Sequence, residues 1–273
     1  MRRIVWLLGL PFVFSLCLSA QDQTATPPPP KVLVIVRENL KPGKAGTTHE
    51  KSERAFVNAF KTANWPQHYF AADSQSGAPR ALFFVGYDSF AAWEKDTQAT
   101  QKNATLAAAL DRATGADAEL LTGYETSTFT YREDQSFHAN LSLAPMRYFE
   151  ITRFHVRPGH DKDWDEIVKI YLDNFPKAVP TAHWAVFEEM YGQGGNVYLV
   201  FNPMKSLSEA DSGLGDYKKF ADAAGAGVMQ RLSELTAAAV DDAQTNLFAF
   251  NPRESYPPPA WVKADPAFWN PKP

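Results

Sequence analysis

The residues best suited to chemistry in this sequence occur twice, at matching positions before a Pro-Gly pair. The pattern comprises Arg37 and Asn39 before Pro42-Gly43, and Arg153 and His155 before Pro158-Gly159. The two copies lie 158 − 42 = 116 residues apart. Arginine binds carboxylates and phosphates through a planar fork, and histidine exchanges a proton near neutral pH. We therefore expect ligand binding or acid–base chemistry wherever these side chains converge.

Strand geometry decides which of these side chains can share a surface. Both segments are strand-like, and successive side chains of a strand point to opposite faces. Arg153 and His155 therefore lie on one face, and Phe154 on the other. Arginines that face a shared interior are costly unless they pair with carboxylates or with an anionic ligand. Three interpretations stay open: an anion site, solvent-exposed strand ends, and an internal salt bridge with Glu125, Glu188 or Glu189.

A second group of candidates is aromatic. His183 and Trp184 follow the first predicted helix of the second half, and Trp65, His68 and Tyr69 hold the matching place in the first half. These side chains are aromatic and polar enough to line a small-molecule pocket. Packing in the core or at a barrel rim is the alternative.

The remaining motifs add neither a metal nor a cofactor. Residues 155–166 are rich in His and Asp, but a calcium loop starting at Asp161 would need Gly where Glu166 stands and Glu where Leu172 stands. The histidines have no zinc-site spacing and no haem-binding context. No serine occupies a nucleophile elbow. We predict no cofactor, no metal ligand and no identifiable catalytic residue.

The elements that must position the candidates follow one order in each half. The first half predicts a strand at 32–40, a helix to 63 with a capping box from Thr47 to Glu50, strands at 68–72 and 81–87, a helical region at 90–114 and a strand at 123–132. The second half predicts a strand at 148–156, a helix to 175 capped by Asp161 or Asp163, strands at 183–191 and 197–202, helix at 214–239 interrupted near Gly225, and a strand at 245–250. Each half reads β-α-β-β-α-β, the ferredoxin-like plan.

The segments VRENLKPGK (36–44) and TRFHVRPGH (152–160) resemble the first-strand signature of the dimeric α/β-barrel superfamily. That superfamily includes the antibiotic-biosynthesis-monooxygenase-like and NIPSNAP-like proteins. The resemblance implies an α+β fold in which two tandem ferredoxin-like units close into one intrachain, pseudo-dimeric α/β barrel. It also implies that Phe154 and Val156 face the helices, and that Arg37, Asn39, Arg153 and His155 face the barrel interior.

The expected organisation has six parts. They are a signal peptide at 1–20, a Pro-rich tether at 21–30, a first unit at 31–133, a linker at 134–146, a second unit at 147–252 and a Pro/Trp-rich tail at 253–273, which we expect to be extended and to dock its aromatic side chains on the barrel. A membrane anchor is the alternative for residues 1–20, although the apolar run is short for a span. Cleavage after Ala20 would remove Cys17, the only cysteine, and would leave no membrane span.

Charge limits the classes of partner. Removal of the signal leaves 27 − 2 = 25 basic residues against 31 acidic ones, a net charge of −6, and no basic run. Nucleic acid and anionic membrane surfaces are therefore not expected partners. We expect a secreted or periplasmic protein that binds a small anionic or aromatic molecule; whether it is an enzyme and how it oligomerises stay open. The alternatives are a cofactor-independent monooxygenase-like enzyme and a structural or partner-binding module.

Overall fold

The computed structural model describes residues 28–192 and 194–271. The predicted signal peptide and most of the predicted tether lie outside these residues. No helix in the described ranges is long and apolar enough to cross a membrane.

The described chain alternates strands and helices in the order that the sequence predicts. The strands are β1 (Val32–Leu40), β2 (Tyr69–Ser74), β3 (Arg80–Tyr87), β4 (Leu121–Tyr131), β5 (Tyr148–Val156), β6 (Ala185–Tyr191), β7 (Val197–Met204) and β8 (Val240–Tyr256). The helices are α1 (Thr47–Thr62), α2 (Phe90–Lys102), α3 (Ala104–Asp117), α4 (Asp161–Ala178), α5 (Ser208–Gly213), α6 (Asp216–Ala224), α7 (Ala226–Ala239), α8 (Pro259–Ala264) and α9 (Pro266–Trp269). Two short 3-10 helices span Ala118–Leu120 and Glu133–Gln135.

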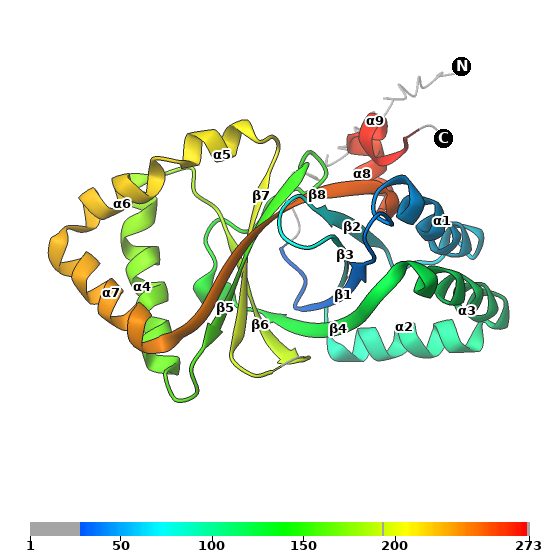
Figure 1. Ribbon diagram of the computed structural model, residues 1–273, viewed down its shortest axis with the longest axis horizontal. Helices are drawn as coiled ribbons and strands as arrows, with labels where there is room; N and C mark the ends of the chain where they lie inside the picture. The colour runs from blue at the N-terminus through cyan, green and yellow to red at the C-terminus, as the bar shows by residue number, and fades with distance from the viewer. Residues whose placement is uncertain (1–27, 193, 272–273) are drawn as a thin grey trace, which may run out of the picture.

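The strands form one closed antiparallel barrel in the order β1-β3-β2-β8-β5-β7-β6-β4. Two junctions join the first four strands to the last four, β2 with β8 and β4 with β6. The helices lie outside, with α1–α3 beside the first four strands and α4–α7 beside the last four (Figure 1). The α+β class and the closed barrel are therefore confirmed.

The two faces of the strands carry different cores. The interior holds a large aromatic cluster that includes Phe84, Phe149 and Phe201. Phe154 and Val156 point the other way, and they pack in a cluster with α4 and α7. The prediction that these two residues meet the helices is confirmed, because the strand period of two holds along β5.

The last strand is longer than the sequence pattern suggests. The predicted strand ends at Phe250, whereas β8 continues to Tyr256 and includes Pro252. A register shift in the β2–β8 pair accommodates the proline, because Ala71 faces Asn251 and Tyr69 faces Tyr256. Proline is tolerated at such bulges, where its missing N–H breaks no ladder bond. The end of β8 thereby reaches the first half of the barrel.

The predicted helix caps are wrong at both first-turn positions. Gly46, with φ of 70°, is the N-cap of α1, and the capping box from Thr47 does not form. His160 is the N-cap of α4, so Asp161 and Asp163 lie inside its first turn. Their carboxylates there complement the helix dipole instead of capping it.

The C-terminal segment packs onto one end of the barrel. Trp269 is buried in the interior cluster, where Trp261 and Phe268 also make contact. The Trp269 indole nitrogen donates to the Ala144 carbonyl oxygen at 2.8 Å, and Arg147 forms an ion pair with Asp265. Helices α8 and α9 lie together against this end (Figure 1). The aromatic residues of the tail dock on the barrel as the sequence predicts, but the expected extended conformation is wrong, because Pro259–Ala264 and Pro266–Trp269 are helical.

Candidate functional site in the barrel

Side chains fill the middle of the barrel and leave a hollow at each end. Ile35, Leu82 and Ile151 line one hollow, and Leu33, Phe84 and Phe149 line the other. These residues lie two apart along β1, β3 and β5, so they form successive layers of one core. The barrel therefore offers two separate sites with different chemistry.

The polar hollow has a volume of about 410 Å³ and carries three arginines, Arg37, Arg80 and Arg153. Arg37 Nη1 lies 3.4 Å from Glu125 Oε2, and Arg153 Nη1 lies 3.1 Å from the carboxylate of Asp242. We call this hollow the arginine mouth. Three guanidinium groups meet two carboxylates there, Glu125 in the lining and Asp242 beside Arg153, so the site carries an excess of positive charge.

Arg80 is the member of the arginine mouth that the sequence analysis missed. Its guanidinium lies 4.9 Å from the centre of the Phe248 ring and donates to the Ala78 carbonyl oxygen. Burial, together with the charge of Arg37, lowers the pKa of Arg80. The signal was present in the sequence, because Arg80 keeps the period of two with the interior residues Leu82 and Phe84.

The predicted candidates divide between the two ends. Arg37, Asn39 and Arg153 line the arginine mouth. The predicted pairing of Arg37 with Glu125 is present, whereas Glu188 binds Arg132.

His155 lies farther along β5, at the strand end, where its Nδ1 is 3.3 Å from the carboxylate of Asp241. Both side chains are substantially exposed there, at 32% and 53%. His155 therefore lies at the exposed strand end beside Asp241, and not in the barrel interior where it was expected.

The opposite hollow is apolar, and we call it the apolar chamber. Its volume is about 460 Å³. Its lining is mostly aromatic and aliphatic and includes Phe70, Phe84, Phe149, Phe187, Phe201, Trp184, Trp261, Leu143 and His68. Phe70 and Phe84 stack at 4.8 Å between ring centres, so flat surfaces already bound the space. A cavity of this size and polarity is typical of small-molecule sites.

Two histidines near the apolar chamber differ in whether a ring nitrogen is free to bind a ligand. His183 Nε2 lies 2.9 Å from the Pro203 carbonyl oxygen, so the backbone occupies it. His68 lines the chamber, and within the described chain its Nδ1 has no hydrogen-bond partner. Burial lowers the pKa of His68, although a backbone hydrogen bond at Tyr256 opposes the shift. The neutral imidazole is therefore the favoured form in the chamber wall.

Trp184, the other predicted candidate at this end, lines the chamber directly. Its indole nitrogen donates to the Gln135 carbonyl oxygen at 2.9 Å. The indole is thus fixed in the chamber wall, with its polar edge satisfied and Phe137 and Phe175 packed against its ring.

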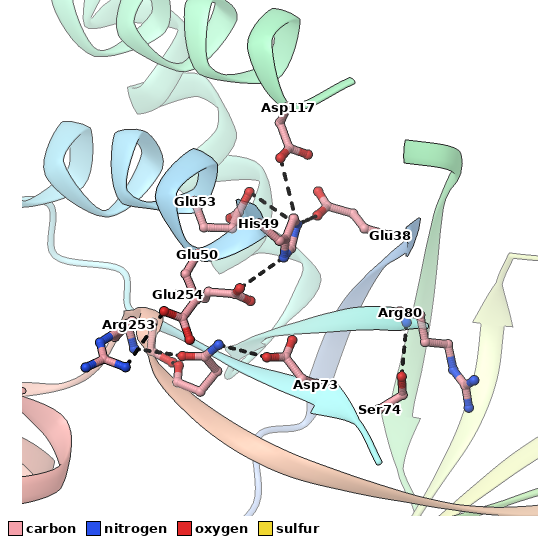
Figure 2. A network of polar contacts seen from close by, with 12 residues as sticks. Glu38, His49, Glu50, Glu53, Asp73, Ser74, Arg80, Asp117, Arg253 and Glu254 are labelled. Carbon is pink, nitrogen blue, oxygen red and sulfur yellow. Dashed lines mark hydrogen bonds and ion pairs between the residues drawn. The ribbon is translucent and has the colours of Figure 1, made fainter. Parts of the chain in front are cut away.

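A third polar group is buried outside the barrel, between β1 and the helices of the first half. His49 of α1 is its centre: Nε2 lies 3.0 Å from Glu38 Oε2, and Nδ1 lies 3.0 Å from Glu254 Oε1 (Figure 2). Glu53 and Asp117 also converge on Nε2, at 3.8 Å each. We call these five residues the His49 cluster. Its ligand-type atoms from Glu38, His49, Glu53 and Asp117 lie within 4.8 Å of one another.

Burial perturbs the titration of the His49 cluster. It raises the pKa of Glu53 to about 10 and that of Glu254 to about 8. Burial alone would lower the pKa of His49, but hydrogen bonds to Glu254 and Glu38 outweigh it and raise that pKa to about 11. The cluster therefore has more acidic groups than one imidazolium can neutralise, and burial favours the protonated forms of Glu53 and Glu254.

The sequence analysis did not single out the His49 cluster. Glu38 lies at a helix-facing position of β1, and His49 and Glu53 are spaced i, i+4 on the buried face of α1. Polar residues at these otherwise apolar, buried positions could therefore have indicated a buried polar cluster. Asp117 and Glu254 come from distant segments that no local pattern connects to α1.

Comparison with known proteins identifies the fold. No protein-family model and no curated protein matches the sequence. A structure from Fusobacterium nucleatum, named as a candidate monooxygenase, matches with a TM-score of 0.52 at 16% identity, over 80% of this chain and 91% of that one. An anthrone oxidase-like protein matches with a TM-score of 0.53 at 15% identity, over 81% and 92%. A candidate chlorite dismutase gives 0.47 at 14% identity, over 82% and 96%.

At such identities the likeness concerns the fold alone. The chain shares its fold with the two structures that match at a TM-score above 0.5, and its closed eight-stranded barrel is consistent with a dimeric α/β barrel.

Proposed function

We propose that the apolar chamber binds a small, largely apolar molecule with an aromatic ring. The observation that carries the proposal is the cavity of about 460 Å³ lined by aromatic side chains. Aromatic rings contact one another favourably in offset-stacked and edge-to-face geometries, and the fixed rings of Phe70, Phe84 and Trp184 offer both. A planar ligand would therefore bury its faces without reordering the chamber.

A matched pair of variants tests this proposal. Ala139 lines the chamber, whereas its neighbour Asn140 is exposed and lies outside the lining. Calorimetric titration with 2-naphthol should give saturable 1:1 binding to the wild type. Ala139→Trp should fill the chamber and weaken binding by about tenfold or more, while Asn140→Trp should leave the affinity within about twofold. Equal affinity in both variants, or no saturable binding by the wild type, would exclude the chamber as the site.

An enzymatic role for the same chamber is the second candidate. The names of two of the matching structures, candidate monooxygenase and anthrone oxidase-like, favour it. Oxidation of an electron-rich ring without a cofactor requires a group that accepts a proton from the substrate, and His68 is the chamber residue with an unpartnered nitrogen in the described chain. Oxygen-electrode assays with anthrone should then show uptake that His68→Phe abolishes. Binding without oxygen uptake would leave the chamber as a binding site only.

The arginine mouth supports a separate anion-binding function. Arg37, Arg80 and Arg153 come from three different strands and converge on one hollow. Because the filled core separates it from the apolar chamber, we assign the two ends to two ligands, or to two groups that are not parts of one small molecule.

We further propose that residues 31–133 and 147–252 are two ferredoxin-like units in one chain and that the protein is exported. The repeated order of strands and helices supports the first statement. The apolar run and the small-residue cleavage site before Gln21 support the second.

A further inference from the structure

The His49 cluster has the donor arrangement of a metal site. The Nδ1 side of the imidazole faces Glu254, while the Nε2 side faces Glu38, Glu53 and Asp117 (Figure 2). A histidine ligand usually donates its other N–H to a carboxylate, which fixes the tautomer and the ring orientation. Glu254 is placed to accept from Nδ1–H, and a cation that displaced the Nε2 proton would bind Nε2 among three carboxyl oxygens.

The spacing of these atoms matches the edge of a coordination tetrahedron. Carboxylate oxygens of Glu38, Glu53 and Asp117 lie 3.0, 3.8 and 3.8 Å from His49 Nε2. A tetrahedron with metal–ligand distances of about 2.1 Å has edges of about 3.4 Å. The three edges that start at His49 Nε2 therefore differ from this value by about 0.4 Å, and the oxygen–oxygen edges, which are within 4.8 Å, would shorten when a cation binds.

Unpartnered atoms point to the same place. Glu53 Oε1 and Asp117 Oδ1 each lie 3.8 Å from His49 Nε2, and within the described chain neither has a hydrogen-bond partner. Both side chains are more than nine-tenths buried. A buried carboxylate oxygen without a partner is costly, and buried charges are usually paired or bound to a metal.

The fold itself does not require polar residues at this position. Glu38 and Phe154 each stand four residues before a Pro-Gly pair, at helix-facing positions of β1 and β5. Phe154 packs with Trp164, Val156 and Tyr198 in the second half. The same sheet–helix contact is thus made by aromatic packing in one half and by the His49 cluster in the other.

We propose that His49, Glu38, Glu53 and Asp117 bind a divalent transition-metal cation, with Glu254 orienting the imidazole. One imidazole nitrogen with carboxylate oxygens suits Mn²⁺, Fe²⁺ or Zn²⁺ better than Ca²⁺ or Mg²⁺, which prefer all-oxygen ligands. All four ligand residues are buried, so the site is closed to substrate. The cation is therefore structural, and it ties β1 to α1 and α3.

Metal content and melting temperature test the site. The full chain is unfolded in the presence of chelator and refolded with MnCl₂, with ZnCl₂, with MgCl₂ or with chelator alone. The wild type should retain one equivalent of Mn²⁺ or Zn²⁺ by mass spectrometry after desalting, and should melt at a higher temperature than the chelator-refolded protein. MgCl₂ should leave the melting temperature unchanged.

Isosteric variants locate the cation. Glu53→Gln and Asp117→Asn should lower retained metal by about tenfold or more, as loss of metal-site residues does. Their chelator-refolded forms should melt at or above the wild-type temperature, because the amide that replaces each carboxyl group can donate a hydrogen bond to the neighbouring carboxyl oxygens. Glu50→Gln is the matched control on α1: Glu50 lies toward Arg253, at 3.7 Å, and its variant should retain one equivalent.

Two results would overturn the proposal. One is a wild type that retains no Mn²⁺ or Zn²⁺ after refolding. The other is retention by Glu53→Gln and Asp117→Asn that equals the wild type. If either variant fails to fold, anomalous diffraction from wild-type crystals grown with MnCl₂ decides: a peak beside His49 Nε2 supports the site, and a peak elsewhere or none refutes it.

Discussion

The arginines of the arginine mouth are only partly buried, which limits what their ion pairs contribute to stability. The side chain of Arg153 is 34% exposed and that of Asp242 is 43% exposed. Partly exposed ion pairs contribute about 1 kcal/mol or less, whereas breaking a buried pair costs about 3–5 kcal/mol. We predict that Arg153→Met changes the free energy of unfolding by less than about 1 kcal/mol in urea titrations.

The same variant should lose anion binding. Calorimetric titration with benzoate and succinate should show weaker binding to Arg153→Met than to the wild type. Arg157→Met is the matched control, because Arg157 lies just past the end of the same strand and pairs with Asp241 at 3.5 Å. A destabilisation of about 3–5 kcal/mol with no anion binding by the wild type would leave a structural salt bridge as the whole role of Arg153.

The buried position of His68 predicts how the stability of the protein changes with pH. Because burial lowers its pKa in the folded state, the unfolded chain binds a proton more readily than the folded chain. His68 therefore costs stability as the pH falls below its ordinary value of 6.5, and costs nothing above it. We expect His68→Phe, which keeps a ring against Tyr256, to lose less melting temperature than the wild type between pH 7 and pH 5. Parallel curves over this range would show that His68 is not held neutral.

Local spacing predicted the residues that lie on one strand face, and it did not predict those that meet through the fold. The period of two placed Arg37, Asn39 and Arg153 at one hollow. His155 follows the same period but lies where β5 ends, so solvent and Asp241 reach it. No period could join His49 to Glu254, because a distance of 205 residues separates them and the bulge of β8 brings them together.

The two C-terminal helices, α8 and α9, cover one side of the apolar chamber. Trp269 of α9 is 3% exposed and donates to the Ala144 carbonyl oxygen, while Trp261 of α8 lines the chamber. Truncation of a buried Trp costs about 3–5 kcal/mol. We predict a loss of that size in Trp269→Ala by urea denaturation, with weaker 2-naphthol binding. Lys263→Ala on α8 should change neither quantity, and an equally stable Trp269→Ala would show that the tail is not part of the folded core.

The observed strand ends differ most from the predicted ones where contacts with distant residues extend a strand beyond its local sequence pattern. The strands from β1 to β7 lie close to their predicted ranges because hydrophobic runs and Pro-Gly turns define them locally. β8 exceeds its prediction because Ser255 hydrogen-bonds the Asn251 carbonyl oxygen and the Ala71 N–H, and so stabilises a bulge around Pro252. The sequence offers Pro252 as a stop signal, and the pairing with β2 overrides it.

Cleavage of the predicted signal peptide decides where the whole mature chain begins. Residues 1–20 have a basic start, an apolar run and a small-residue end before Gln21. We predict that intact-mass analysis of protein recovered from the exported fraction gives a chain beginning at Gln21. Cys17 would be absent from it, so iodoacetamide should add no mass to the unfolded protein. Recovery of the chain with Met1 retained would contradict export by cleavage and favour a membrane anchor.

The closed barrel predicts that neither half folds alone. Within residues 31–133 the strand order is β4-β1-β3-β2, so removal of the second half leaves β4 and β2 as unpaired edges. It also exposes the interior faces of Leu33, Ile35 and Phe84, which now contact second-half residues such as Phe149 and Phe201. Long unpaired edges beside exposed apolar surface lead to aggregation.

Size-exclusion chromatography and thermal melts of residues 31–133 check this prediction. The fragment should elute as aggregate or as a partly folded species without a cooperative transition. Co-refolding with residues 134–273 should restore a 1:1 complex, because the β2–β8 and β4–β6 pairings need no covalent link between the halves. A monomeric fragment that melts cooperatively would refute the dependence of each half on the other. A soluble homodimer would show instead that two copies of one half can close a barrel, as expected if the chain is a fused pseudo-dimer.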